Sequence, residues 1–358
     1  MRTAKLSHRK HLNLVKDYVK TAAAAKLVYV SDSEPGIARL RKGKGFSYVL
    51  DDTPLKSKAE INRIRKLAIP PAWEKVWICT KENGHIQATG FDTRQRKQYR
   101  YHPLWGLLRN ETKFHKLLEF GKQLPALRLQ LEKDLSLTEL AEKKVLAVVI
   151  SLMERTYIRV GSAEYEKQNG SHGLTTLHDR HVAIEGAAIS FSFKGKKGIY
   201  HTVSLKNKKL AKIIKQCRDI PGKELFQYYG TDGQRHAIDS GMVNQYIKEY
   251  TGEDFTAKDF RTWAGCLTLL RAFKSIGLYG NATQCKQNIN QALDYVSAKL
   301  GNTRTVCRKY YVHPGIIRLY EENKMAAYLD ELDNIEEPDG ITGLTKDETI
   351  LMRLLEVA

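Results

Sequence analysis

The spacing of apolar residues changes once along this chain, at Pro103. Before it, short apolar runs rich in β-branched and aromatic residues alternate with turn residues, a pattern typical of strands. After it, apolar residues recur every three or four positions over long stretches, which predicts helices that bury one face. The sequence therefore predicts an α+β protein, with a small β-rich amino-terminal lobe followed by a larger, mainly α-helical domain that also carries a β-hairpin.

Four segments follow from this change of pattern. We expect a basic arm or helix at residues 1–25, a β-rich domain at 26–105, a helical catalytic domain at 106–325 and an acidic extension at 326–358. The β-rich domain should hold a twisted antiparallel sheet interrupted by one helix. Its expected strands are 27–30, 46–50, 75–79 and 85–89, and its expected helix is 57–67.

Charge indicates the class of partner. Lys and Arg number 59 against 40 Asp and Glu, which gives a net charge of +19 at pH 7. A folded domain with such a surplus is expected to bind a polyanion, and double-stranded DNA is the first candidate. An incidentally basic surface is the alternative.

Several classes of site and location are disfavoured. The cysteines form no C-x-x-C pair and no hydrophobic leader precedes them, so we expect a cytoplasmic protein with reduced thiols. No apolar run is long enough for a membrane span. His178 and His181 lack a second ligand pair, so no metal is expected, and the absence of a P-loop disfavours nucleotide hydrolysis. The cysteines are Cys79, Cys217, Cys266, Cys285 and Cys307.

Cationic residues occur at three predicted structural positions. Arg159 is expected in the last turn of a helix that ends near Gly161, where a cation also complements the helix dipole. Lys196 sits at the tip of a predicted hairpin. Its side chain can simply be solvated, or the hairpin can place its ammonium in a DNA groove. Thr256 and Asp259 are spaced nearly as a capping box that starts a helix. Lys258 and Arg261 share a face in its first turn, and cations there favour a bound phosphate.

Two adjacent tyrosines supply a candidate nucleophile. Gly301 is predicted to close one helix, and a second is expected to run from Thr303 to a stop at Pro314. On that helix Tyr310 and Tyr311 would point about 100° apart, so only one can face a given site. A tyrosine that attacks a phosphodiester needs its developing charge neutralised, and arginine forks do so without a metal or other cofactor.

Six short motifs carry a family resemblance: AIPPAW at 68–73, GHIQATG at 84–90, RKQYRY at 96–101, IRVG at 158–161, KDFRT at 258–262 and CRKYYVHP at 307–314. Over residues 31–320 the chain resembles type IB DNA topoisomerases of the short, poxvirus-like form found in bacteria. The resemblance implies an enzyme that nicks one strand of duplex DNA, lets it rotate and reseals it without ATP. It further implies a monomeric, C-shaped clamp associated with the nucleoid.

The resemblance also implies roles, position by position. Tyr311 would be the nucleophile that joins a DNA 3′-phosphate. Arg159 and Arg261 would hold that phosphate, and Lys196 on the hairpin would protonate the leaving 5′-oxygen. Lys258 resembles a further lysine that assists near the scissile phosphate.

One position departs from the family pattern, and four others lie outside the catalytic set. Many members carry a histidine nine residues before the tyrosine, where this chain has Asn302. An amide can donate a hydrogen bond but adds no charge, so we expect weaker charge stabilisation and retained activity. The implied amino-terminal contacts to DNA are Arg96, Gln98, Tyr99 and Tyr101.

Two other functions fit part of the pattern. A tyrosine recombinase uses a similar set of Arg, Lys and Tyr residues, although the β-rich amino-terminal lobe argues against it. A non-catalytic DNA-packaging protein needs only the positive charge, and it predicts that Tyr311→Phe changes nothing.

Overall fold

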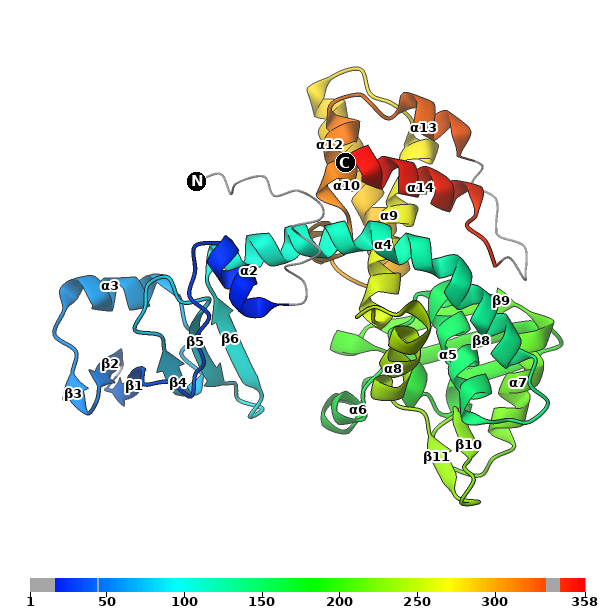
Figure 1. Ribbon diagram of the computed structural model, residues 1–358, viewed down its shortest axis with the longest axis horizontal. Helices are drawn as coiled ribbons and strands as arrows, with labels where there is room; N and C mark the ends of the chain where they lie inside the picture. Colours follow the sequence, from blue (N-terminus) through cyan, green and yellow to red (C-terminus); the bar gives the residue numbers. More distant parts are fainter. Residues whose placement is uncertain (1–16, 44, 333–341, 358) are drawn as a thin grey trace. The chain divides into compact units, whose positions relative to one another are not determined.

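The computed structural model describes residues 17–43, 45–332 and 342–357, and the chain divides into two compact units, Met1–Lys116 and Leu117–Ala358. Of the expected arm, only its last residues are described, and they include helix α2, Tyr18–Ala24. The remainder of the arm and the centre of the acidic extension lie outside the described residues. Figure 1 labels the elements along the chain.

Within the described part of the first unit, six strands form one antiparallel sheet in the order β3-β2-β1-β4-β5-β6 (Figure 1). Helix α3, Lys58–Lys66, buries Ile64 against the apolar residues of the sheet, such as Ile78 and Ala88. The expected antiparallel sheet is confirmed. The strands are β1 (Ile37–Lys42), β2 (Gly45–Leu50), β3 (Thr53–Pro54), β4 (Glu74–Ile78), β5 (Ile86–Phe91) and β6 (Lys97–Tyr101).

Strand prediction in this unit was wrong for residues 27–30 and missed β1, β6 and the two-residue β3. Residues 27–30 form only an isolated bridge, Val28 to Gly84, and the Val30 N–H donates instead to Nδ1 of His85 at 3.1 Å. Strands β1 and β6 were missed because both are rich in Lys and Arg, and half of the β1 residues and nearly all of the β6 residues are exposed. An exposed, charged strand carries little of the apolar alternation by which strands are predicted.

The second unit is mainly helical and holds the three-stranded antiparallel sheet β7-β8-β9. Its central helix is α5, which is apolar nearly all round, and Val145 and Ile150 are both fully buried. The helices are α4 (Pro103–Leu135, which begins in the first unit), α5 (Glu142–Thr156), α6 (Ala163–Asn169), α7 (Lys208–Arg218), α8 (Ser240–Thr251), α9 (Ala257–Ile276), α10 (Ala282–Leu300), α11 (Arg304–Tyr310), α12 (Pro314–Glu321), α13 (Ala326–Glu331) and α14 (Lys346–Val357).

The remaining elements of this unit are short. Sheet β7-β8-β9 consists of Val182–Glu185, Ala188–Lys194 and Tyr200–Lys206, and β10 (Gln227–Tyr229) pairs with β11 (Arg235–Ala237). The pattern of residues 174–184 is strand-like, but only residues 182–184 belong to a strand, β7, and the 3-10 turns η1 (Leu174–Thr176) and η2 (Asp179–His181) precede it.

Two helix ends differ from the prediction. Helix α5 ends at Thr156 and is capped by Tyr157 in the left-handed conformation, at φ 58°, so Arg159 lies in the following loop and not in a last helical turn. Helix α11 ends at Tyr310, and Pro314 begins α12 instead of stopping α11. Proline is well suited to the first turn of a helix, because its missing N–H would have no partner there. The predicted cap at Gly301 is confirmed, with φ +56°.

Part of the acidic extension belongs to the core of the second unit. In α14, Leu351 and Leu354 are fully buried, and Glu348 is 2% exposed. Arg128 donates to Glu348 at 2.7 Å, and the Trp263 indole donates to the same carboxylate at 2.9 Å. Among the described residues, no helix combines the length and apolar character needed to cross a membrane.

Candidate active site

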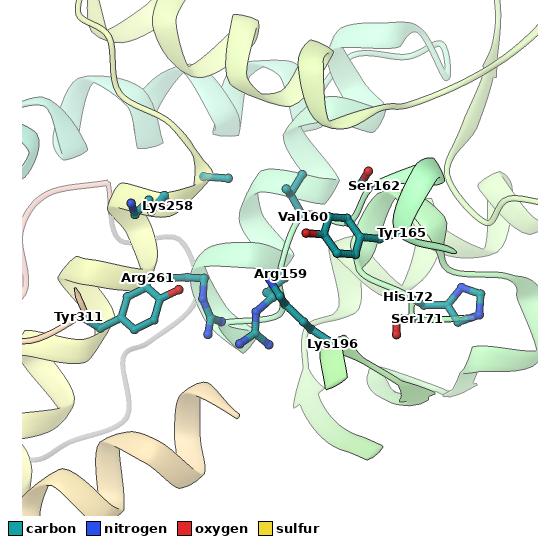
Figure 2. A pocket seen from close by; sticks show the side chains of 12 residues that line it. Arg159, Val160, Ser162, Tyr165, Ser171, His172, Lys196, Lys258, Arg261 and Tyr311 are labelled. Atoms are coloured by element: carbon teal, nitrogen blue, oxygen red, sulfur yellow. The ribbon is translucent and has the colours of Figure 1, made fainter. Parts of the chain in front are cut away.

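A hollow of about 280 Å³ in the second unit collects the predicted catalytic residues (Figure 2). Among the residues that the structure describes, those that line it include four cationic side chains and no carboxylate. A hollow of this charge, without internal neutralisation, is suited to bind an anion. The predicted residues that line it are Arg159, Lys196, Lys258, Arg261 and Tyr311.

Arg261 lines the hollow and is fixed there by the start of its helix and by its hydrogen bonds. Thr256 and Asp259 form the predicted capping box, which fixes the start of α9 one turn before the arginine. The Arg261 side chain is buried, and its two terminal nitrogens donate to the carbonyl oxygens of Tyr157 and, at 2.6 Å, Leu300. Its Nε is the single buried side-chain nitrogen or oxygen without a hydrogen-bond partner in the described part of the chain. This donor is available to a phosphate oxygen.

Arg159 lies next to Arg261 in Figure 2. It donates to Oδ1 of Asn302 at 2.7 Å and to the carbonyl oxygen of Gly301 at 3.2 Å. Burial, together with the charge of Arg261, lowers the pKa of Arg159 to about 10. Burial also lowers the pKa of Arg261, against the opposing effect of Tyr311. Two like charges held side by side away from bulk water repel each other, and a bound phosphate relieves that repulsion.

The structure distinguishes the two adjacent tyrosines. Tyr311 follows α11, where its φ of −128° takes the chain out of the helix, and its ring centroid lies 5.2 Å from Cζ of Arg261. Tyr310 is 38% exposed and is not among the residues that line the hollow. Spacing alone could not make this choice, because it depends on where α11 ends.

Gly265 of α9 sets the position of Tyr311, and sequence analysis did not identify it. A Cβ at Gly265 would lie 2.3 Å from the carbonyl oxygen of Tyr311, so the two segments touch backbone to backbone. The adjacent Cys266 contacts the same segment, because its Sγ accepts the N–H of His313 at 3.3 Å. A glycine inside a helix is the local signal that could have indicated such a close approach.

The two lysines reach the hollow from different elements. Lys196 sits at the tip of the β8–β9 hairpin, as predicted, and its Nζ lies 5.2 Å from the centroid of the Tyr165 ring. The next residue, Lys197, has a φ of +65°, which tightens the tip. Lys258 is exposed in the first turn of α9. Both lysine side chains are therefore more mobile than those of the buried Arg261 and the half-buried Arg159.

Asn302 is close to this group but does not line the hollow. Its Oδ1 accepts the hydrogen bond from Arg159, and its Nδ2 donates to the carbonyl oxygen of Leu300 at 3.2 Å. In this structure the amide therefore orients Arg159.

His201 of β9 joins the hairpin to the Gly301 turn, a link that sequence analysis missed. A Cβ at Gly195 would lie 2.5 Å from the His201 ring, and a Cβ at Gly301 would lie 2.4 Å from it. The ring also stacks on Phe193, with centroids 5.3 Å apart. Burial, followed by the charges of Arg159 and Arg261, lowers the pKa of His201, so the imidazole is neutral at pH 7.

Comparison with known proteins agrees with this geometry. Residues 95–337 match the family model of the catalytic core of eukaryotic DNA topoisomerase I. The chain is also 33% identical to DNA topoisomerase 1B of Acanthamoeba polyphaga mimivirus over 296 residues, which are 80% of this chain and 88% of the viral one. The chain belongs to the type IB DNA topoisomerase family.

Other comparisons extend this family assignment. Residues 45–92 match the amino-terminal domain of bacterial DNA topoisomerase IB, which speaks against the recombinase alternative. DNA topoisomerase 1B of Vaccinia virus (strain Copenhagen) is 22% identical over 235 residues, or 65% of this chain and 72% of the viral one.

The predicted DNA contacts of this topoisomerase-family chain lie along β6 of the first unit. Tyr99 and Tyr101 are 42% and 49% exposed, and their rings stack with centroids 5.8 Å apart. Arg96 pairs with Asp92 at 2.6 Å, and Gln98 donates to the same carboxylate at 3.0 Å. The exposed tyrosine pair thus has a fixed, charged support beside it.

Proposed function

We propose that the chain is a DNA topoisomerase that relaxes supercoils by nicking and resealing one strand of duplex DNA. The observation that carries the proposal is the convergence of Tyr311 with the guanidinium groups of buried Arg261 and half-buried Arg159. They meet in a hollow whose described lining includes no carboxylate. That arrangement supplies a nucleophile and fixed positive charge at one place.

In the forward step, the phenolic oxygen of Tyr311 loses its proton to solvent water and attacks phosphorus. Arg159 and Arg261 neutralise the non-bridging oxygens as negative charge builds up on them. The bond from phosphorus to the 5′-oxygen breaks, and Lys196 gives that oxygen a proton because an alkoxide is a poor leaving group. Lys258 assists near the same phosphate. The products are a 3′-phosphotyrosyl diester and a free 5′-hydroxyl.

Resealing is the reverse reaction. The 5′-hydroxyl attacks the phosphotyrosyl diester, returns its proton to Lys196 and expels Tyr311. The diester retains the free energy of the broken bond, so the strand closes without ATP. Between the two steps the free end can rotate, which releases superhelical tension.

We also propose that one copy of the chain closes its two units around duplex DNA as a C-shaped clamp in the bacterial nucleoid. The family resemblance and the net charge of +19 support this binding mode. Tyr99 and Tyr101, beside Arg96 and Gln98, would contact the groove and backbone.

A plasmid assay tests the proposed reaction. The wild type should relax supercoiled plasmid of either sign in EDTA without ATP, and denaturant should trap a covalent protein–DNA adduct. Tyr311→Phe should abolish both results and leave DNA binding intact, whereas the matched variant Tyr310→Phe should remain active. Relaxation by Tyr311→Phe would reject the proposed nucleophile.

A further inference from the structure

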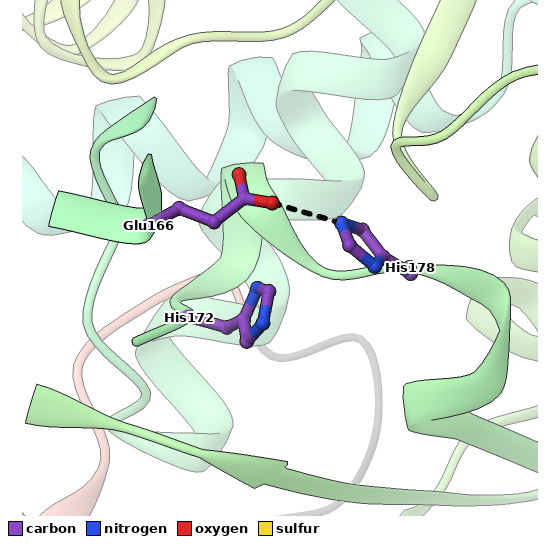
Figure 3. Close-up of side chains that lie close together, drawn as sticks. All are labelled: Glu166, His172 and His178. Carbon is purple, nitrogen blue, oxygen red and sulfur yellow. Dashed lines mark hydrogen bonds and ion pairs between the residues drawn. The ribbon is translucent and has the colours of Figure 1, made fainter. Parts of the chain in front are cut away.

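Glu166, His172 and His178 form a second polar cluster (Figure 3). It borders the hollow, because His172 is also part of the hollow's lining. Each of these side chains offers one potential metal-ligand atom, and these atoms all lie within 4.8 Å of one another. The cluster is partly shielded from water, since the side chains of Glu166 and His178 are 11% and 14% exposed. The proposed DNA cleavage uses none of the three.

Hydrogen bonds already orient both imidazoles. Nδ1 of His172 lies 2.6 Å from the carbonyl oxygen of Thr176, so this nitrogen carries the proton and Nε2 keeps a free lone pair. Nε2 of His178 lies 3.1 Å from Oε1 of Glu166. An imidazole held by a backbone carbonyl through its other nitrogen is the usual state of a metal-binding histidine.

Sequence spacing suggested a different partner for His178. His181, three residues later, turns its Nδ1 to the backbone N–H of His178 at 3.0 Å. Its ring centroid is 4.5 Å from that of His172, so it closes one side of the cluster. The ligand group is therefore assembled by the fold from α6 and the loop after it, and no short motif reveals it.

We propose that Glu166, His172 and His178 bind one divalent transition-metal ion of the zinc class. Two imidazoles and a carboxylate are the ligands of many three-residue zinc sites, whereas Mg²⁺ and Ca²⁺ prefer oxygen ligands alone. A tetrahedral ion with bonds of about 2.0–2.1 Å needs ligand atoms about 3.3 Å apart. The widest separation here, at most 4.8 Å, must therefore close by about 1.5 Å or less.

Lys223 competes with a metal for this site. Its Nζ lies 2.8 Å from Oε1 of Glu166, and its side chain is 64% exposed, so it can swing into solvent at little cost. A bound dication would replace this ammonium on the carboxylate. Removing the lysine should therefore tighten metal binding, an effect not expected of a stray surface histidine.

The position of the cluster gives metal binding a local structural effect. Helix α6 carries Tyr165, whose ring supports Lys196, immediately before Glu166, and His172 itself lines the hollow. An ion shared by these residues would tie α6 to the loop that borders the hollow. The proposal concerns metal binding alone and does not depend on the proposed reaction.

Metal titration of the full chain tests the site. Protein stripped with EDTA and then freed of it should bind one Zn²⁺ by calorimetry, and Co²⁺ should give the visible absorption of a tetrahedral site. Glu166→Gln and His178→Ala should each weaken Zn²⁺ binding at least tenfold. Lys223→Ala should tighten it severalfold.

The matched control is His236→Ala, which removes an exposed imidazole that pairs with Asp232 elsewhere in the second unit. It should leave zinc affinity unchanged, and circular dichroism should verify that every variant folds. Zinc binding that survives His178→Ala unchanged, or that Lys223→Ala does not tighten, would overturn the assignment. So would a wild type that binds no zinc.

Discussion

Replacing Gly265 by alanine should misplace the nucleophile without touching any reacting group. The new Cβ would lie 2.3 Å from the carbonyl oxygen of Tyr311, whereas a relaxed contact between carbon and oxygen is about 3.3 Å. Either α9 or the Tyr311 segment must therefore move by about 1 Å. Both partners at this contact are backbone, so no flexible side chain can absorb the shift.

The size of the effect follows from that displacement. A misplacement of about 1 Å can cost about 100-fold in rate, so we expect Gly265→Ala to slow covalent adduct formation by about that factor. Overpacking costs about 1–3 kcal/mol, and the better helix propensity of alanine returns about 0.5–1 kcal/mol. The net loss in the free energy of unfolding should therefore lie between about 0 and 2.5 kcal/mol, and the protein should remain folded.

Single-turnover cleavage of a nicked oligonucleotide, from which the short downstream fragment with the new 5′-hydroxyl dissociates, measures this rate directly. The control is Gly106→Ala, at a helical glycine of α4 where an added Cβ has nothing within 4 Å. It should cleave at the wild-type rate and should be no less stable. If Gly265→Ala cleaved as fast as the control, the backbone contact would not determine where Tyr311 lies.

Four further perturbations test other parts of the site and its support. Arg159→Lys keeps a positive charge but loses the planar fork that can contact Asn302 and a phosphate together. The cleavage rate should therefore fall by about 100-fold, while filter binding of plasmid at low salt changes little. An unchanged cleavage rate would show that charge alone suffices. His201→Ala should release the Lys196 hairpin from the Gly301 turn and slow cleavage by on the order of 10-fold. That loss should largely disappear when sulfur replaces the leaving 5′-oxygen, because a thiolate needs no proton from Lys196; a loss that persists with sulfur would place the effect on the arginines instead. Burial opposes the charge of Glu348, but its hydrogen bonds with Arg128 outweigh burial and lower the pKa of this carboxyl below 4.5. The Glu348 carboxylate therefore contributes its full stabilisation above pH 4.5 and loses it as the pH falls below that value. Below pH 4.5, the free energy of unfolding, measured in urea, should drop more steeply in the wild type than in Glu348→Gln. Breaking this buried pair by Arg128→Met should cost about 3–5 kcal/mol at pH 7, and a smaller loss than 1 kcal/mol would show that α14 does not depend on it.

Local signals in the sequence predicted local structure well. The Thr256 capping box, the glycine cap at 301 and the Lys196 hairpin depend on residues within a few positions, and all three are confirmed. The hairpin tip and the α9 start each bring a predicted cation to the hollow, and the family resemblance identified the same set by position.

Contacts between distant segments could not be predicted in the same way. Gly265 touches Tyr311, and His201 touches Gly301, across intervals that no periodicity spans. The left-handed cap at Tyr157 moved Arg159 out of its expected helix, since a tyrosine rarely adopts that conformation. The catalytic roles proposed for the residues that line the hollow stay predictions until variants are measured.

The two arginines differ in what holds them. Arg261 donates to main-chain oxygens at residues 157 and 300, and any amino acid at those positions presents the same oxygen. Arg159 leans partly on the side-chain amide of Asn302. A single substitution at Asn302 can therefore change the position of the Arg159 guanidinium. The Arg261 guanidinium can be moved only by a change in the path of the main chain.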